Sequence, residues 1–194
     1  MRVIAGTAGS LPLKSPKGLD TRPTTDRIKE TLFNILMPYL PGAVFVDLFS
    51  GGGSIGIEAL SRGARKAYFV ENAPKAIFCI QENLSFTKFT DHAVVLKQDA
   101  GTSLHQIHEE QADLIFMDPP YGLGLVEPVL RGLAQMKYVT KETLIIVEVH
   151  LDAELSYLSE LGLAFIKEKI YKTNKHIFIK RKGQDEESCI SGKF

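Results

Sequence analysis

Residues 47–56 read DLFSGGGSIG, and this stretch decides the fold of the chain. The apolar, β-branched run Ala43–Phe49 predicts a buried strand, and the amphipathic segment after the glycines predicts a helix. Gly51, Gly53 and Gly56 therefore form a G-x-G-x-x-G pattern between a strand and a helix. Because glycines permit a tight turn that a ligand can approach closely, we expect a cofactor site here. The alternative is a tight turn that binds nothing.

Strands and helices are predicted to alternate after this turn. Further apolar runs predict strands at Ala67–Val70, Ala93–Leu96, Leu114–Met117 and Thr143–Val149. Amphipathic segments predict helices at Ile55–Ser61, Ala76–Leu84, Leu104–His108, Leu125–Met136 and near Glu154–Leu161. Two polar-alternating runs predict a closing hairpin of Leu163–Lys172 and Lys175–Lys182. This alternation indicates βαβ units, and hence a doubly wound α/β fold with a mainly parallel sheet.

The 194 residues are about the length of one domain, and we divide them into three parts. Residues 1–40 are expected to form an N-terminal extension, an irregular hairpin followed by a helix from about Thr24 to Met37. Residues 41–183 are expected to form the catalytic domain. The acidic run within 184–194 predicts a disordered tail.

Composition excludes several classes of protein. The chain has 23 Lys/Arg, 23 Asp/Glu and two cysteines, and it contains no apolar run long enough to span a membrane. Two cysteines predict neither a disulfide framework nor a zinc site, so we expect no metal and a cytoplasmic location. Residues 165–183 nevertheless hold seven Lys/Arg against one Asp/Glu. This uneven charge suggests nucleic-acid contact, although a solvated surface explains it equally well.

Acidic residues at the ends of three predicted strands favour a particular cofactor. Glu71 follows the second strand, where a carboxylate can accept hydrogen bonds from a ribose. Asp47 precedes the glycines, where it would repel a pyrophosphate but attract an ammonium group, which favours S-adenosylmethionine over a dinucleotide. Asp99 follows the third strand and is expected to accept from the adenine amine or to cap a helix. The predicted cofactor residues are Asp47, Phe49, Gly51, Gly53, Gly56, Glu71, Asn72, Asp99 and Ala100.

The fourth predicted strand runs into Asp118-Pro119-Pro120-Tyr121. The two prolines fix φ and remove two backbone donors, which leaves carbonyl acceptors beside the Asp118 carboxylate. Such a rim suits a planar substrate whose amino group donates two hydrogen bonds and whose face stacks on Tyr121. In isolation the tetrapeptide would predict only a rigid turn, but it lies one strand from the glycine-rich turn. We therefore expect these four residues to form the catalytic site.

Together these motifs resemble the S-adenosylmethionine-dependent amino-methyltransferases, in which D-P-P-Y marks methylation of an amino or amide nitrogen. The segment from Thr21 to Leu36, which contains RPTTDR, is similar to the RsmD family of bacterial 16S ribosomal RNA guanine-N2 methyltransferases. The resemblance covers about residues 1–150 and implies seven strands, the last antiparallel, with helices on both faces. It also implies methyl transfer to the exocyclic N2 of a guanine. The implied partner is 16S ribosomal RNA or a partly assembled small subunit, and the implied state is a monomer.

The resemblance assigns the methionine end of the cofactor to Asp47 and the glycines, the ribose to Glu71 and the adenine to Asp99. RNA contacts are expected from basic residues flanking the acidic core, namely Arg22, Arg27, Lys172, Lys175 and Arg181. The chain departs from the family pattern at 8–13 and 173–175, which bear on RNA docking. Three alternatives are left open. They are methylation of DNA adenine or of another amino or amide group, a nicotinamide-dependent oxidoreductase, and a non-enzymatic RNA-binding module.

Overall fold

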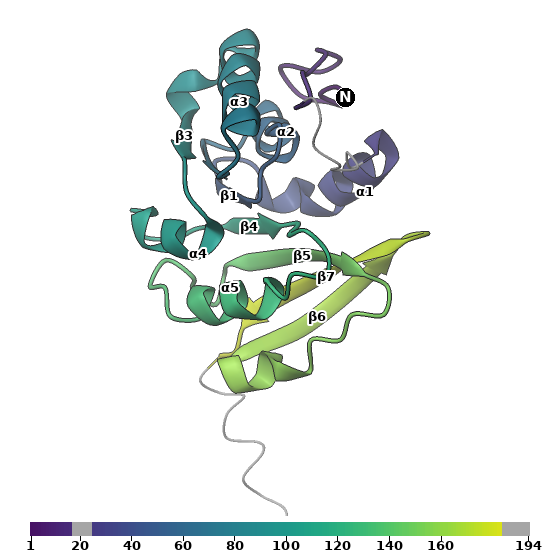
Figure 1. Ribbon diagram of the computed structural model, residues 1–194, viewed down its shortest axis with the longest axis vertical. Helices are drawn as coiled ribbons and strands as arrows, with labels where there is room; N and C mark the ends of the chain where they lie inside the picture. The colour runs from purple at the N-terminus through teal and green to yellow at the C-terminus, as the bar shows by residue number, and fades with distance from the viewer. Residues whose placement is uncertain (17–24, 184–194) are drawn as a thin grey trace, which may run out of the picture.

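The computed structural model describes residues 1–16 and 25–183, and its centre is a seven-stranded sheet (Figure 1). The strands are β1 Val44–Leu48, β2 Lys66–Val70, β3 Ala93–Leu96, β4 Leu114–Met117, β5 Leu144–His150, β6 Leu163–Ile170 and β7 Asn174–Arg181. Their spatial order is β3-β2-β1-β4-β5-β7-β6. The first five are parallel, whereas β7 is antiparallel to both neighbours, β5 and β6. The predicted fold, including its antiparallel last strand, is confirmed.

Helices cover both faces of the sheet, as predicted (Figure 1). The α-helices are α1 Asp26–Leu36, α2 Ser54–Ser61, α3 Pro74–Thr87, α4 Ala100–Ser103 and α5 Val126–Leu133. Short 3-10 turns occupy Met37–Tyr39, Thr90–His92, Leu104–Gln106 and Ser156–Leu161. Phe45, Phe116 and other residues of one face pack against α1, α2 and α3, and residues of the other face pack against α4 and α5. Because alternate residues of each strand point to opposite faces, both apolar clusters share the same strands.

Two predicted helices differ from the observed ones. Leu104–His108 is not an α-helix, because the helix begins earlier, at Ala100, where the Asp99 side chain accepts a hydrogen bond from the Thr102 backbone N–H. The chain then tightens into the 3-10 turn and becomes extended at Ile107. The segment near Glu154–Leu161 is likewise a 3-10 turn, which ends at Gly162 with a φ of 67°. Both segments are too short to bury an amphipathic face of several turns.

A buried ionic cluster joins α1 to α2 and to the N-terminal segment. Lys29 of α1 and Glu58 of α2 are both fully buried, and their charged atoms lie 3.3 Å apart. The Glu58 carboxylate also accepts from the backbone N–H groups of Ile4 and Ala5 and from Arg62 Nε. Burial lowers the pKa of Lys29 against the opposing effect of Glu58. This cluster therefore fixes three segments of the described chain to one another.

The start of the chain packs onto the face of the sheet that α1 covers. Val3, Ala8 and Leu13 are buried in the same apolar cluster as Leu32 and Phe33. Of the predicted parts, the beginning of the first helix, Arg22 and the tail 184–194 lie outside the described residues. Within the described ranges, no helix is both long and apolar enough to cross a membrane.

Candidate active site

The glycine turn lies where the strand order reverses, at the carboxyl ends of β1 and β4. Ligands bind at this position in open α/β sheets. Phe49, Gly51 and Gly53 have φ values of 65°, 54° and 80°, so the turn uses left-handed backbone that favours glycine. A Cβ added to Gly56 would lie 2.4 Å from the Phe69 ring, so glycine there permits close packing of α2 on β2. The turn and the helix are thus fixed by the glycines that the pattern identified.

Two carboxylates accept hydrogen bonds from backbone N–H groups of the glycine turn and of the helix that follows it. Asp47 Oδ2 accepts from the Gly56 backbone N–H at 3.0 Å, and Glu71 Oε2 accepts from the Gly51 N–H at 2.8 Å. Glu71 Oε1 also accepts from the N–H groups of the two residues that follow it. Asp47 is 1% exposed, and burial, together with the nearby charge of Glu71, raises its pKa to about 7. The hydrogen bond from Gly56 ties the Asp47 carboxylate to the first turn of α2.

Beside the turn, a cavity of about 170 Å³ opens between the ends of β2 and β3 and the start of α5. It is lined by Phe49, Val70, Glu71, Asn72, Gln98, Asp99, Ala100, Gly101, Leu125 and Val129. The cavity combines apolar walls with carboxylate acceptors, a set that fits the base and ribose of a nucleoside. Of the residues expected to bind a cofactor, the structure brings Phe49, Glu71, Asn72, Asp99 and Ala100 together around this cavity. Asp47, Gly51, Gly53 and Gly56 lie outside this lining.

Asp99 has a second role at this cavity. Its carboxylate caps α4, accepting from the Thr102 N–H at 2.9 Å and from the Thr102 hydroxyl at 2.7 Å. The hydrogen bond from the backbone N–H holds the pKa of Asp99 below its usual value. Both of the roles expected for Asp99 are thus compatible with its position.

Asp118-Pro119-Pro120-Tyr121 follows β4, directly beside the strand that carries the glycine turn. Removal from water, and then the negative charges of Glu148 and Asp47, raise the pKa of Asp118 to about 8. Pro119 is buried, whereas Tyr121 is exposed, and its ring meets the His150 ring edge-on at 6.2 Å between centroids. The segment thus presents an aromatic ring at the surface next to a partly buried carboxyl group.

A buried polar group beside Asp118 was not predicted from the sequence. Glu148 on β5 and His176 on β7 are 5% and 0% exposed, and Glu148 Oε2 lies 2.9 Å from His176 Nε2. Asn174 donates to the other oxygen of Glu148, and the Tyr171 hydroxyl lies 3.2 Å from His176 Nδ1. The one signal in the sequence was a glutamate within the otherwise apolar strand LIIVEVH. Among the described residues, no group of three or more His, Cys, Asp or Glu side chains is suited to hold a metal.

The predicted RNA-contact residues differ in their accessibility. Arg27 on α1 and Lys172 at the β6–β7 turn are exposed. Lys175 is half-buried, with its amine 3.3 Å from the Glu168 carboxylate. The Arg181 guanidinium donates to the backbone carbonyls of Val139 and Ala134, so its geometry favours a structural role. Arg22 lies outside the described residues.

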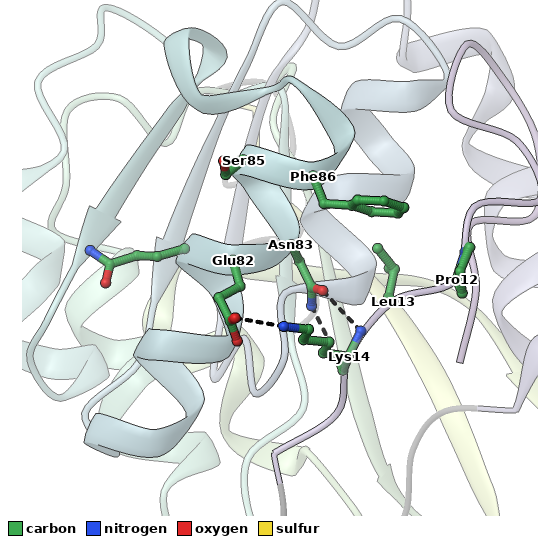
Figure 2. Close-up of a pocket in the computed structure, with 8 residues that line it drawn as sticks. Pro12, Leu13, Lys14, Glu82, Asn83, Ser85 and Phe86 are labelled. Carbon is green, nitrogen blue, oxygen red and sulfur yellow. Dashed lines mark hydrogen bonds and ion pairs between the residues drawn. The ribbon is translucent and has the colours of Figure 1, made fainter.

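A larger hollow of about 720 Å³ lies between the N-terminal segment and α3 (Figure 2). Its walls include Leu13 and Phe86, and its rim carries the Lys14–Glu82 ion pair. Buried Asn83 accepts from the Lys14 N–H at 2.9 Å and donates to the carbonyls of Lys14 and Gly52 at 3.0 and 2.9 Å. This asparagine ties the N-terminal segment to the glycine turn.

Comparison with known proteins places this geometry in a family. The chain matches the family described as "Conserved hypothetical protein 95" over residues 1–180. It is 36% identical to the ribosomal RNA small subunit methyltransferase D of Haemophilus influenzae, over 87% of this chain and 88% of that protein. The Escherichia coli protein of the same name is also 36% identical, over 76% of this chain and 74% of its own length.

Solved structures agree with the sequence comparison. An Escherichia coli protein described as a methyltransferase superimposes with a TM-score of 0.80 at 30% identity, covering 95% of this chain and 99% of that one. A Haemophilus influenzae protein described as a methylase gives a TM-score of 0.78 at 31% identity, covering 94% and 99%. The family match over residues 1–180 includes both the glycine turn and the Asp-Pro-Pro-Tyr segment. The chain therefore belongs to the Conserved hypothetical protein 95 family, the RsmD family of methyltransferases.

Proposed function

We propose that this protein transfers a methyl group from S-adenosylmethionine to the exocyclic N2 of a guanine in small-subunit ribosomal RNA, in the cytoplasm. The observation that carries the proposal is the position of Asp118-Pro119-Pro120-Tyr121, one strand from the glycine turn and at the switch point of the sheet. The names of the relatives support ribosomal RNA as the substrate class. We also propose that the protein acts as a monomer, that residues 1–40 help to dock the RNA, and that residues 41–183 carry the chemistry.

The residues around the 170 Å³ cavity fit the proposed methyl donor. Glu71 would accept from the ribose hydroxyls, and Asp99 from the adenine amine, while Phe49 and Ala100 would contact the base. When bound, S-adenosylmethionine supplies an electrophilic methyl group. The glycine turn, supported by Asp47, would hold the methionine end of the donor.

Asp118 and the Pro119 carbonyl would accept the two hydrogens of the target amine and so orient its nitrogen lone pair. Fixing the amine in this orientation lowers the barrier mainly by proximity. A base inside a helix cannot present its amine at this site, so the guanine would be unpaired or flipped out. Tyr121 would stack on its face.

Replacing Glu71 with alanine is expected to weaken S-adenosylmethionine binding by about 1.5–3 kcal/mol, because hydrogen bonds to a charged acceptor are lost. Isothermal titration calorimetry measures the change, with the exposed Glu110→Ala as the matched control. Glu71→Gln should fall between the two, because it keeps one acceptor oxygen. Equal affinity of Glu71→Ala and the parent would remove Glu71 from the ribose site.

Replacing Tyr121 with alanine is expected to lower turnover efficiency by roughly 10- to 100-fold, since base–aromatic stacking contributes about 1–3 kcal/mol. Tyr121→Phe should keep most of the activity, because stacking does not use the hydroxyl. Single-turnover methylation, with donor binding measured on the same preparations, tests both variants. A Phe variant as inactive as the Ala variant would refute the stacking role.

RNA binding should depend on salt through the exposed basic residues. Neutralising Arg27, Lys169 and Lys172 with glutamine is expected to flatten the slope of log affinity against log salt by about one unit for each phosphate that the protein no longer neutralises. The matched control neutralises the exposed Lys88, Lys137 and Lys141 of the acidic core. Filter binding at several salt concentrations gives the slopes. Equal slopes for the two triple variants would mean that the first set is only a solvated surface.

The proposed function is tested by mass mapping of ribosomal RNA from cells that lack this protein. We expect one guanine of the small-subunit RNA to lose a methyl group and to regain it when the parent gene is returned. Loss of a methyl group from an adenine or from a protein instead would favour one of the other amino-group methyltransferases.

A further inference from the structure

A row of ionisable side chains continues from Asp118 across the sheet. Met117, the last residue of β4, pairs with Val147 of β5. Because the two strands are parallel, the residues that follow these two, Asp118 and Glu148, lie side by side. Glu148 in turn pairs with His176, and His176 pairs with Lys169 on β6. Paired residues of neighbouring strands point to the same face, so the four side chains share the face that α1 covers. The catalytic carboxyl proposed above is thus the first member of a chain of polar groups.

The Glu148 carboxylate is held at both oxygens. A carboxylate can only accept, so His176 Nε2 carries the proton of the 2.9 Å hydrogen bond. In the neutral imidazole, Nδ1 is then left to accept from the Tyr171 hydroxyl at 3.2 Å. The His176 ring is also enclosed edge-on by Tyr171 and Phe116. Asn174 fixes the second oxygen.

Stability alone does not explain this arrangement. A buried ion pair or polar pair typically contributes little compared with well-packed apolar residues, and here the rest of β5 from Leu144 to Val149 is apolar. The arrangement also leaves Asn174 Oδ1 buried without a hydrogen-bond partner. The negative charge of Glu148 thus lies beside Asp118 even though burying it costs free energy of desolvation.

We propose that Glu148, held by His176 and Asn174, is a positioning residue of the methyl transfer: its fixed negative charge acts on Asp118 and strengthens the hydrogen bonds that Asp118 accepts from the target amine. In the reaction the nitrogen lone pair forms the N–C bond while the donor's C–S bond breaks and leaves its electron pair on sulfur. Positive charge moves onto the nitrogen, whose N–H groups become better donors. The surplus proton passes to the Asp118 carboxylate and then to water. This role of Glu148 rests on the proposed function.

Charges on several strands determine how Asp118 titrates. Asp47 on β1 and Glu148 on β5 both act on it, and with burial they raise its pKa to about 8. His176 on β7 and Lys169 on β6 continue the row, and Tyr171 adjoins His176. Removing the charge of Glu148 should therefore lower the pKa of Asp118, but also make the Asp118 carboxylate a weaker acceptor. Below the pKa of Asp118 the two effects on the rate oppose each other, because the lower pKa leaves more of the carboxylate ionised. Above the pKa the carboxylate is already ionised, so only the weaker acceptor affects the rate.

The first measurement needs no methyl donor and no RNA. Carbon-13 NMR of the unliganded protein follows the Asp118 carboxyl, assigned by the disappearance of its signal in Asp118→Asn. We expect its midpoint to fall by about one unit or more in Glu148→Gln, as for removal of a nearby like charge. The matched control is Glu168→Gln, on the same hairpin, whose residue pairs with Ile177 and so faces the other side of the sheet. Equal midpoints in the two variants would overturn the proposal.

The second measurement is the pH profile of kcat/KM for methyl transfer. In Glu148→Gln the rising limb should move to lower pH, and the plateau above it should fall by about 3- to 10-fold, as expected for a less basic acceptor. A merely structural defect would lower the whole profile without moving the limb. A moved NMR midpoint with an unchanged plateau would overturn the role in catalysis. If the parent protein does not methylate guanine, the proposed function fails, while the NMR result still decides the coupling.

A second pair of variants covers the case in which Glu148→Gln does not fold. His176→Gln keeps a donor to Glu148, whereas His176→Leu removes it. We expect the Asp118 midpoint and the plateau of His176→Gln to lie nearer the parent than those of His176→Leu. Identical behaviour of the two would contradict the role of His176 in holding Glu148.

Discussion

Replacing Asp118 with alanine is expected to lower kcat/KM for methyl transfer by about 100- to 1000-fold while S-adenosylmethionine still binds. The loss is expected to be large because the proposed reaction makes Asp118 a charged acceptor for the reacting amine in a site removed from water, where such groups have their greatest effect. Binding should persist because Asp118 does not line the 170 Å³ cavity. Single-turnover methylation and calorimetry on one preparation measure both quantities.

The pH dependence of stability provides an independent check on the raised pKa of Asp118. The pKa of Asp118 in the folded protein, about 8, lies above that of an unfolded chain, so its contribution to stability is fully present at low pH and is lost as pH rises through about 8. Asp118→Asn removes this loss and should raise the melting temperature above pH 8. The exposed Asp91→Ala is the control for charge removal.

For the activity prediction, methylation by Asp118→Ala at the parental rate would show that the amine is oriented by other groups.

Replacing Glu58 with alanine is expected to lower the free energy of unfolding by about 3–5 kcal/mol. The variant leaves the buried Lys29 without its carboxylate partner and two backbone N–H groups without an acceptor, and breaking a buried pair carries a penalty of this size. A small domain has only about 5–15 kcal/mol of stability, so much of the protein would unfold at moderate urea concentrations. Urea denaturation followed by circular dichroism measures the change.

Two further variants separate charge from packing in this cluster. Glu30→Ala removes an exposed carboxylate from α1 and should change stability by less than about 0.5 kcal/mol. The double change Lys29→Met and Glu58→Met should be less destabilising than Glu58→Ala, because the buried Lys29 charge is removed together with its partner, while Arg62 loses Glu58 in both variants. A Glu58→Ala midpoint equal to that of Glu30→Ala would show that the cluster adds nothing to stability.

The sheet could be predicted well from the sequence because its signals were local. Each of the five parallel strands contains a short apolar run, and Gly51 and Gly53 define the turn through their own backbone geometry. The hairpin of β6 and β7 was visible in its alternating residues and its short connection. Helix boundaries were less predictable where one capping residue decides the first turn. Asp99 caps α4, so this helix begins at Ala100 rather than at Leu104.

The polar groups beneath the site could not be predicted in the same way. Glu148 and His176 are 28 residues apart in sequence, and each alone resembles a polar residue of a half-exposed strand. Only the antiparallel register of β5 and β7 brings them together. Two other polar contacts were equally unpredictable, because their partners come from separate segments. Glu58 meets Lys29 and the backbone N–H of Ile4, and Asn83 donates to the Gly52 carbonyl.

The order of β6 and β7 in the sheet has a consequence for folding. β6 comes first in the chain but lies outside β7, so it can join the sheet only together with β7. A hairpin with a short connection forms within about 1–10 μs, much faster than distant strands find each other. We therefore expect the hairpin to form first and to dock on β5 as one unit. In a molecule that has not completed this step, the 170 Å³ cavity would already be formed, but His176 would not yet lie beside Glu148. If the proposed roles hold, such a folding intermediate would bind the methyl donor but transfer the methyl group poorly.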